Sequence, residues 1–466
     1  MNKIKHLIGN SMVFAVGNLG SKLISILLVP LYTYVLSKQQ YGTVDLITNT
    51  VSLLLPIISL DAYDAVLRFV MDKSTDNRKV YTNAIIITVT GALIFLLVMP
   101  LANLAHIPQL FYFYIILVCQ AFNSTFIQYA RAIGQVKVFA LNGILTTLVT
   151  GISNIILLVY LHWGINGYLL SIIIASVISS AYVFIRLRLI NEFKISLINK
   201  KLIRKMLIYS IPLIPNALAW WATNTSSRYF ILYFIGVGAN GLFAVANKIP
   251  NLLSMLNSIF FQAWQMSAIE EYNSEEKSEF YSNVFNYYSQ MMFLGSSFIL
   301  FVIQPFMHIF VAQSFYSAWS LIPLLLFSVL YSSFSSFLGT NYIAAKQTMG
   351  IFYTTVISAV INVVLIFLFV PILGANGAGL SSSISFLVMW LIRIRDTKRF
   401  IDIRLDVQSI KLNHVVLILQ SIILYLPINF LLIQIIEFSL FMLNIFVNIK
   451  FIKGLLDFGK TVFRRR

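Results

Sequence analysis

GNLGSKLISILLVP (residues 17–30) lies within an apolar run from residue 9 to residue 36 and carries one charged side chain, Lys22. A helix needs about 20 apolar residues to cross the hydrocarbon core of a bilayer, and this run is longer. Two lysines precede it, as in a signal peptide, but the run continues to Leu36 without a small-residue cleavage site. We therefore expect a retained first transmembrane helix with a lysine near its middle.

The whole chain has the composition of an integral membrane protein. Of its 466 residues, 59% are hydrophobic and 11% are charged, which is more apolar surface than a soluble core buries. The net charge of +17 does not indicate a nucleic-acid partner, because a soluble nucleic-acid-binding protein carries its basic residues on a polar background within a recognisable module. The single cysteine, Cys119, excludes a disulfide framework and a cysteine-based metal site.

Apolar runs long enough to span a bilayer recur along the chain. They predict fourteen transmembrane helices, over residues 9–36, 44–70, 81–103, 110–132, 139–160, 165–187, 206–235, 241–266, 281–304, 318–340, 349–371, 376–394, 412–430 and 433–451. The predicted fold class is therefore an all-α polytopic membrane protein.

The basic residues of the loops are distributed unequally between the two sides of the membrane. Counted from a cytoplasmic N-terminus, the inside segments carry nearly all of the loop lysines and arginines, among them Arg131 and Arg393, whereas the outside loops carry only Lys38. Because loops rich in Lys and Arg stay in the cytoplasm, this pattern predicts that both termini are cytoplasmic. It also accounts for most of the net charge without a polyanionic partner.

Two segments of the chain resemble each other. LHWGINGYLLS (residues 161–171) matches ILGANGAGLSS (residues 372–382), and further upstream Tyr41-Gly42 parallels Asn240-Gly241. The order of these matches predicts a duplication of about 200 residues in which each copy has six helices and the same orientation, an architecture that transporters use to form a site between two halves. We expect three parts: a six-helix lobe over residues 1–200, a second over 201–405, and two extra helices with a basic tail over 406–466.

Three basic residues fall inside predicted helices instead of loops: Lys22 in the first, Arg228 in the seventh and Lys248 in the eighth. Charges in a membrane helix usually face the interior of a bundle or a water-filled cavity. The alternative is that a long side chain reaches the nearer interface, which is hardest for Lys22, roughly 20 Å from either end of its helix. We expect the three cations to line a central cleft, with Lys22 and Arg228 facing each other.

The acidic residues of the second predicted helix do not match the cations in depth. Asp45 lies at its outer start, as a partner for Lys38, while Asp61, Asp64 and Arg68 lie near its inner end. Their spacing predicts one helical face with an ion pair between Asp64 and Arg68, which is either a self-neutralised structural set or an inner gate. The cleft is then left with cations that lack a counter-ion, and an anionic ligand would complete it.

The sequence gives no indication of an enzyme. The five histidines are isolated from one another and from carboxylates, so the sequence predicts no metal site. It contains no P-loop, GxSxG or Asp-rich pyrophosphate motif, and the outside loops are short and almost free of charge. A membrane enzyme of polysaccharide assembly would need acid and base groups at one membrane face.

Several stretches resemble one known family, the Wzx-type polysaccharide repeat-unit flippases of bacteria, within the superfamily that also contains MATE multidrug exporters and lipid II flippases. They are residues 18–46 (NLGSKLISILLVPLYTYVLSKQQYGTVDL), 67–73 (LRFVMDK), 228–249 (RYFILYFIGVGANGLFAVANKI) and the GINGYLLS and GANGAGLS hairpins. The resemblance implies two six-helix lobes, alternating access, and a cationic cavity for an undecaprenyl diphosphate-linked oligosaccharide. It also implies a bacterial cytoplasmic membrane, no cofactor, and a polysaccharide polymerase and assembly proteins as partners.

The resemblance suggests a mechanism in which the diphosphate binds at Lys22, Arg228 and Lys248 while the prenyl tail stays in the lipid. Asp61 and Asp64 are the carboxylates that could couple transport to H⁺ or Na⁺, and the sequence does not decide between these ions. The alternatives are a MATE-like antiporter for organic cations, which three uncompensated positive charges disfavour, and the membrane enzyme considered above.

Overall fold

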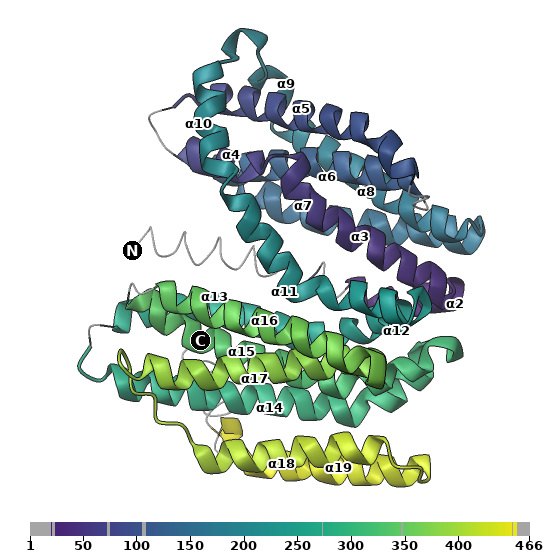
Figure 1. Ribbon diagram of the computed structural model, residues 1–466, viewed down its shortest axis with the longest axis vertical. Coiled ribbons are helices and arrows are strands. Elements are labelled where there is room, and N and C mark those ends of the chain that lie inside the picture. The colour runs from purple at the N-terminus through teal and green to yellow at the C-terminus, as the bar shows by residue number, and fades with distance from the viewer. Residues whose placement is uncertain are drawn as a thin grey trace, which may run out of the picture. The chain divides into compact units, whose positions relative to one another are not determined.

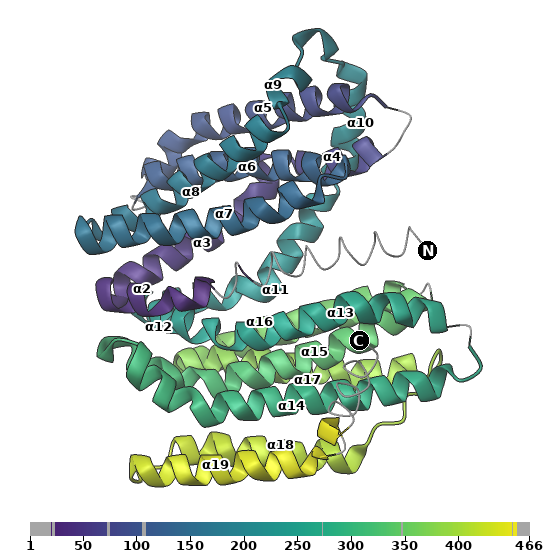
Figure 2. The same ribbon diagram turned by 180° about the vertical axis from the view of Figure 1, so that it is seen from behind.

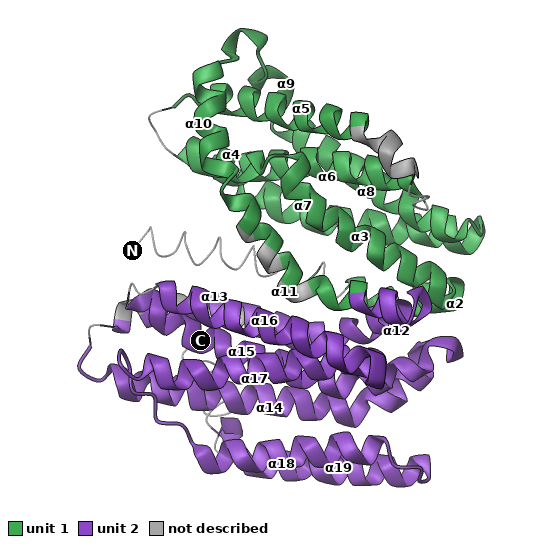
Figure 3. Cartoon of the chain, in the orientation of Figure 1, with its two compact units in different colours: residues 1–229 green, residues 230–466 purple. Residues whose placement is uncertain are grey.

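A computed structural model describes residues 20, 24–71, 75–104, 109–272, 274–345, 348–449 and 451–453. The chain divides into two compact units, Met1–Tyr229 and Phe230–Arg466 (Figure 3). The boundary falls inside a helix, and the segment from residue 201 to this boundary, which the sequence assigns to the second lobe, groups with the first unit. This grouping follows from packing, because Leu202 and Met206 belong to a hydrophobic core of the first unit.

The first unit is all helical in its described part (Figure 1). Its elements are α2 (Val29–Val35), α3 (Lys38–Ile58), α4 (Ala62–Met71), α5 (Asn77–Leu104), α6 (Leu110–Ala132), α7 (Val136–Asn154), the π-helical turn η1 (Ile155–Tyr160), α8 (Gly164–Arg186), α9 (Leu189–Glu192), the 3-10 turn η2 (Ile195–Leu197), α10 (Lys200–Ser210) and α11 (Leu213–Phe234), which crosses the unit boundary. Ser37 starts α3 with a capping box that includes Gln40.

The second unit is also helical throughout its described residues. Its elements are α12 (Val237–Lys248), α13 (Pro250–Glu271), α14 (Lys277–Phe310), the 3-10 segment η3 (Gln313–Leu321), α15 (Ile322–Ala344), α16 (Thr348–Leu373), α17 (Ala375–Thr397), α18 (Val407–Leu424) and α19 (Phe430–Val447). The pair α18 and α19 lies beside α14 in both views (Figures 1 and 2). A polar chain joins the three helices: Ser297 donates to Gln420 (2.7 Å), and Gln420 donates to Glu437 (3.0 Å).

Eleven helices of the described part are long and apolar enough to cross a membrane. They correspond to eleven of the fourteen predicted spans, including the last two, so the chain is a multi-pass membrane protein, although the count of fourteen is not confirmed. The predicted span 9–36 begins outside the described residues, which contain only the shorter apolar helix Ile24–Val35 from it. Spans 206–235 and 241–266 are each divided in two, next to Pro212 and at Pro250, where proline removes a backbone donor.

The two hairpins that match in sequence also match in structure. Gly164 and Gly374 both have a positive φ (51° and 61°) and stand at the start of α8 and α17, which are 23 residues long in each case. Three residues after each, Gly167 and Gly377 pack against the preceding helical segment so closely that an added Cβ would lie 3.2 Å and 2.3 Å from a backbone oxygen. A glycine is therefore favoured twice in each hairpin, for conformation and for close packing.

Candidate functional site

The structure describes two of the three predicted cations, Arg228 and Lys248. Lys22 lies outside the described residues, so its assignment stays a prediction. Arg228 belongs to α11 in the first unit, and Lys248 is the half-buried last residue of α12 in the second unit. We therefore describe the surroundings of Arg228, which the first unit contains by itself.

Arg228 has a counter-ion in the structure. Its Nε donates to Oδ2 of Asp45 on α3 at 2.8 Å, and the two side chains are only 15% and 16% exposed. The predicted pairing of Asp45 with Lys38 is therefore wrong, and so is the prediction that Arg228 lacks a counter-ion. The reason is geometric: the ion pair joins residues 183 positions apart, because α11 lies against α3.

Two further hydrogen bonds fix α11 on α3. The hydroxyl groups of Tyr229 and Thr50 are 2.7 Å apart, and Nε1 of Trp221 donates to the backbone oxygen of Asn49 at 2.8 Å. The rings of Trp221 and Tyr229 are also in contact, with centroids 5.2 Å apart. On each helix these residues recur at helical spacing, so one polar and aromatic face of α11 docks on one face of α3. We call these contacts, with the Arg228–Asp45 pair, the α3–α11 dock.

A buried network of tyrosines lies at the N-terminal end of α3. The ring of Tyr32 is 4.8 Å from that of Tyr168 and 6.1 Å from that of Tyr41. Asn154 donates to the Tyr32 hydroxyl (2.9 Å) and accepts from Ser171 (2.8 Å). Hydrogen bonds between buried polar side chains stabilise membrane helix contacts. The network thus holds four helices together beside the α3–α11 dock: α2, α3, α7 and α8.

Asp61 lies at a break between two helices and not within one. Leu60 and Asp61 both have left-handed backbone conformations, with φ of 47° and 53°, so the chain turns between α3 and α4. The hydroxyl of Ser210 on α10 donates to the backbone oxygen of Leu60 at 2.7 Å and helps to hold this turn. Asp61 is 1% exposed, and its Oδ1 has no hydrogen-bond partner among the described residues. Such strained turns at non-glycine residues concentrate at functional sites.

The predicted pair of Asp64 and Arg68 is not formed. Gln128 on α6 donates to Oδ1 of Asp64 at 3.3 Å, and Arg131 of the same helix is the cation whose charge acts on this carboxyl group. Arg68 is exposed, and within the part of the chain that the structure describes it has no ion pair with Asp64. Because the helix break separates Asp61 from α4, the predicted common helical face of Asp61, Asp64 and Arg68 is also wrong.

Arg393 is a buried cation that sequence reasoning assigned to a cytoplasmic segment. It is 4% exposed on α17 and donates to the backbone oxygen of Ser335 (2.7 Å) and to the hydroxyl groups of Thr354 (3.0 Å) and Thr355 (3.1 Å). These neutral oxygens belong to α15 and α16, so the guanidinium joins three helices of the second unit. No group of three or more metal-ligating side chains occurs in the described residues.

Comparisons with solved structures show the fold. A structure described as "Lipid II flippase MurJ, inward closed conformation" is 12% identical, covers 96% of this chain and 100% of its own, and has a TM-score of 0.72. An inward-facing multidrug resistance MATE family transporter of the MOP superfamily is 14% identical, with coverages of 82% and 95% and a TM-score of 0.66. An outward-facing MATE family transporter is 14% identical, covers 85% of this chain and 95% of its own, and has a TM-score of 0.59. At these identities the likeness establishes the fold alone.

Comparisons of sequence show the family. No curated protein matches this chain. Residues 7–265, more than half of the 466, match the family described as "Polysaccharide biosynthesis protein". This segment includes α3 and α11, and therefore both sides of the α3–α11 dock. With the family match and the structural likeness together, the chain belongs to the polysaccharide biosynthesis protein family and has the fold of the MOP superfamily of transporters and flippases.

Proposed function

We propose that the protein is a flippase that moves an undecaprenyl diphosphate-linked oligosaccharide repeat unit from the cytoplasmic to the outer leaflet of a bacterial cell membrane. The product would serve the synthesis of a surface polysaccharide: capsule, O-antigen or exopolysaccharide. One combined observation carries this proposal: a polysaccharide biosynthesis family match lies on a fold shared over 96% of the chain with a structure named as a lipid II flippase. We further propose a polymerase and assembly proteins as partners and cytoplasmic termini.

The diphosphate carries the charge that the predicted cations would recognise. We assign it to Lys22, Arg228 and Lys248, of which Arg228 already has Asp45 as its partner. A guanidinium can exchange one oxyanion for another, and it binds phosphate oxygens in the same forked geometry as carboxylate oxygens. In this proposal the substrate diphosphate competes with Asp45 for Arg228, so the α3–α11 dock loosens when substrate binds.

The membrane potential would favour the proposed direction of transport. Moving a charge of about −2 out of a cell with an inside-negative potential is favoured by roughly 2 × 2.3 kcal/mol per 100 mV, less any charge carried by the protein. An additional ion, H⁺ or Na⁺, would act through the carboxylates near the α3–α4 break. Of these, we propose Asp61 as the gating or coupling group, because it is buried and one of its oxygens lacks a partner.

Deletion of the gene tests the proposed function directly. Cells without it should lose surface polysaccharide and accumulate a diphosphate-linked prenyl oligosaccharide in the inner leaflet, identified by mass spectrometry of extracted lipids and by its protection from an enzyme added outside spheroplasts. Complementation with the wild-type gene is the control. Loss of polysaccharide without an accumulated lipid-linked intermediate would contradict flipping and point to an earlier step.

Lys22 is tested by two substitutions. Lys22→Ala removes a charge that we place near mid-membrane and should abolish surface polysaccharide at an unchanged protein level, whereas Lys22→Arg keeps the charge and should retain part of it. Immunoblots of membranes measure the protein level, and binding of a polysaccharide-specific antibody measures export. Normal export by Lys22→Ala would show that this lysine does not hold the diphosphate.

The MATE-like antiporter is the second candidate, because a MATE transporter shares the fold with a TM-score of 0.66. It requires a cavity for organic cations, and the Arg228–Asp45 pair reduces the excess of positive charge that disfavours it. Purified protein in liposomes distinguishes the two functions. Transport of ethidium with no effect of added prenyl diphosphate sugar would favour the antiporter, and the opposite result would favour the flippase.

A further inference from the structure

Helix α10 (Lys200–Ser210) is amphipathic, and one of its faces is already occupied. Leu202, Met206 and Ser210 are buried on this face, where α10 packs on α4 and α5. Asn199 caps the helix by accepting from the backbone N–H of Leu202 at 2.9 Å. The helix is therefore fixed in the first unit, and its opposite face is open to the surroundings.

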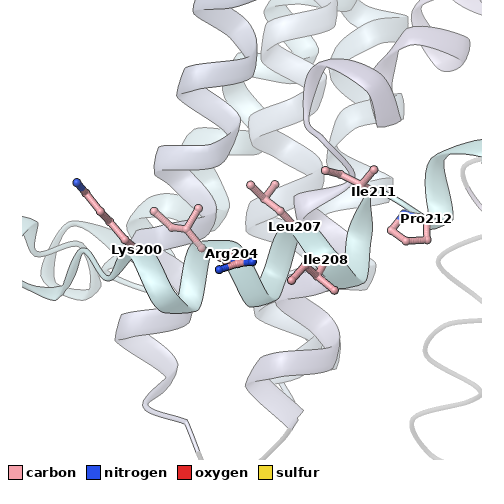
Figure 4. A pocket seen from close by; sticks show the side chains of 7 residues that line it. Lys200, Arg204, Leu207, Ile208, Ile211 and Pro212 are labelled. Atoms are coloured by element: carbon pink, nitrogen blue, oxygen red, sulfur yellow. The ribbon is translucent and has the colours of Figure 1, made fainter.

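A groove of about 540 Å³ runs along the face of α10 that points away from α4 and α5 (Figure 4). It is lined by Lys200, Ile203, Arg204, Leu207, Ile208, Ile211 and Pro212. These positions repeat every three to four residues, so they form one stripe on the helix. All of them belong to the first unit.

The lining of this α10 groove changes in character from one end to the other. Lys200 and Arg204 line its start with their aliphatic stems and carry their charged groups at its rim, and the apolar side chains of Leu207, Ile208 and Ile211 continue it, in the order that Figure 4 shows along the helix. From residue 200 to residue 211 a helix rises roughly 16 Å. A groove with basic residues at one end and apolar side chains along the rest is complementary to an amphiphilic molecule with an anionic head group.

The two basic side chains of the groove are not neutralised by acidic neighbours. No acidic residue lines the groove, and in the described chain neither Lys200 nor Arg204 forms an ion pair. Glu192, the acidic residue of the neighbouring α9, is held by Arg78 at 3.4 Å and by the Tyr129 hydroxyl at 3.0 Å. The groove therefore attracts anions.

The segment before α10 also exposes large apolar side chains. Ile190, Ile195 and Ile198 are 67%, 74% and 40% exposed, and Ile208 within the groove is 64% exposed. Exposed isoleucines among lysines and arginines are typical of a helix that lies in the membrane interface with its apolar side chains in the acyl region. This environment is the one in which a lipid can reach the groove.

We propose that the α10 groove binds one anionic phospholipid of the leaflet that faces it, with the phosphate on Lys200 and Arg204 and an acyl chain along Leu207, Ile208 and Ile211. The site is separate from the three cations assigned to the transported diphosphate, and the proposal does not depend on transport. A bound lipid of this kind would anchor α10, and through Ser210 the turn at Leu60, in the interface.

Native mass spectrometry of the full-length protein in detergent tests the proposal. Phosphatidylglycerol and phosphatidylcholine with identical acyl chains are added separately, and the bound fraction is measured. We expect a tightly bound phosphatidylglycerol and at least tenfold weaker phosphatidylcholine. Inorganic phosphate at millimolar concentration should not displace the lipid, because it lacks the apolar part. Equal binding of the two phospholipids, or displacement by inorganic phosphate, would overturn the proposal.

Two pairs of substitutions on the same helix locate the site. Lys200→Gln with Arg204→Gln should weaken phosphatidylglycerol binding about 30-fold, from about 1 kcal/mol for each basic residue near an anionic surface and 1.4 kcal/mol for each factor of ten. Lys201→Gln with Lys205→Gln removes the same charge from α10 outside the groove, and should change binding less than about threefold. Equal losses in both pairs would show general attraction to the helix and not a groove site.

The apolar end and the identity of the lipid need their own controls. Ile208→Ser with Ile211→Ser leaves the charge unchanged and should weaken phosphatidylglycerol binding, which a purely electrostatic site would not show. Undecaprenyl diphosphate is added as a competitor. Two results together would show that the groove belongs to the transported substrate and that the phospholipid proposal is wrong. Undecaprenyl diphosphate would displace phosphatidylglycerol at equal concentration, and the variant with Lys200→Gln and Arg204→Gln would bind neither lipid.

Discussion

Asp45 and Arg228 form a largely buried ion pair between two helices, so each charge stabilises the other. Removing one partner of a fully buried pair costs roughly 3–5 kcal/mol, because the remaining charge is left without compensation. Since 15% and 16% of these side chains remain exposed, we expect Asp45→Ala to lower the free energy of unfolding by about 2 kcal/mol. The midpoint of thermal unfolding in detergent measures this change.

Lys38 provides the matched control at the residue scale. It is the basic residue nearest to Asp45 in sequence, and proximity in the sequence alone would make it the partner, but the structure gives that role to Arg228. Lys38→Ala should therefore change stability by less than about 0.5 kcal/mol. In a double-mutant cycle, Asp45→Ala and Arg228→Ala should show a strong coupling, and Asp45→Ala and Lys38→Ala none. The reverse pattern would contradict the α3–α11 dock.

The parts of the site that the sequence failed to predict are the contacts between distant helices. Hydropathy located the eleven spans, and the match between residues 161–171 and 372–382 located the two glycine hairpins, because both signals are local in the sequence. The partners of Asp45 and Asp64 depend on which helix lies opposite, and the nearest basic residues in sequence, Lys38 and Arg68, are not those partners. The break at Leu60–Asp61 contains no glycine that would mark it in the sequence. The nearest proline, Pro56, lies one turn earlier, within α3. The left-handed backbone of Leu60 and Asp61 reveals it, and the hydrogen bond from Ser210 helps to hold it.

At the scale of single elements, the hairpins before α8 and α17 share a pattern but differ in tightness. A Cβ at Gly377 would lie 2.3 Å from the backbone oxygen of Phe369, while one at Gly167 would meet atoms no closer than 3.0 Å. Gly377→Ala should therefore destabilise the second unit by about 1–3 kcal/mol, as overpacking does, and Gly167→Ala should cost less. Thermal unfolding of both variants provides the measurement, and a larger effect at Gly167 would contradict the close packing at Gly377.

At the scale of the whole molecule, Asp61 is the place where transport could respond to an ion. We expect Asp61→Asn, which keeps the size of the side chain and removes its charge, to slow flipping in liposomes and to abolish any dependence of the rate on a pH gradient. Asp64→Asn should retain that dependence, because Asp64 has Gln128 and Arg131 beside it. If the dependence persists in Asp61→Asn, the coupling group lies elsewhere.

The contact between Trp221 and Tyr229 has an optical consequence. An indole whose Nε1 donates to a backbone oxygen and whose ring lies 5.2 Å from a tyrosine emits fluorescence that depends on this surrounding. In a variant with Trp221 as its single tryptophan, the emission maximum would report whether α11 is seated on α3. If a prenyl diphosphate releases Arg228 from Asp45 when it binds, titration with this ligand would shift the emission maximum, and the shift can be followed in real time.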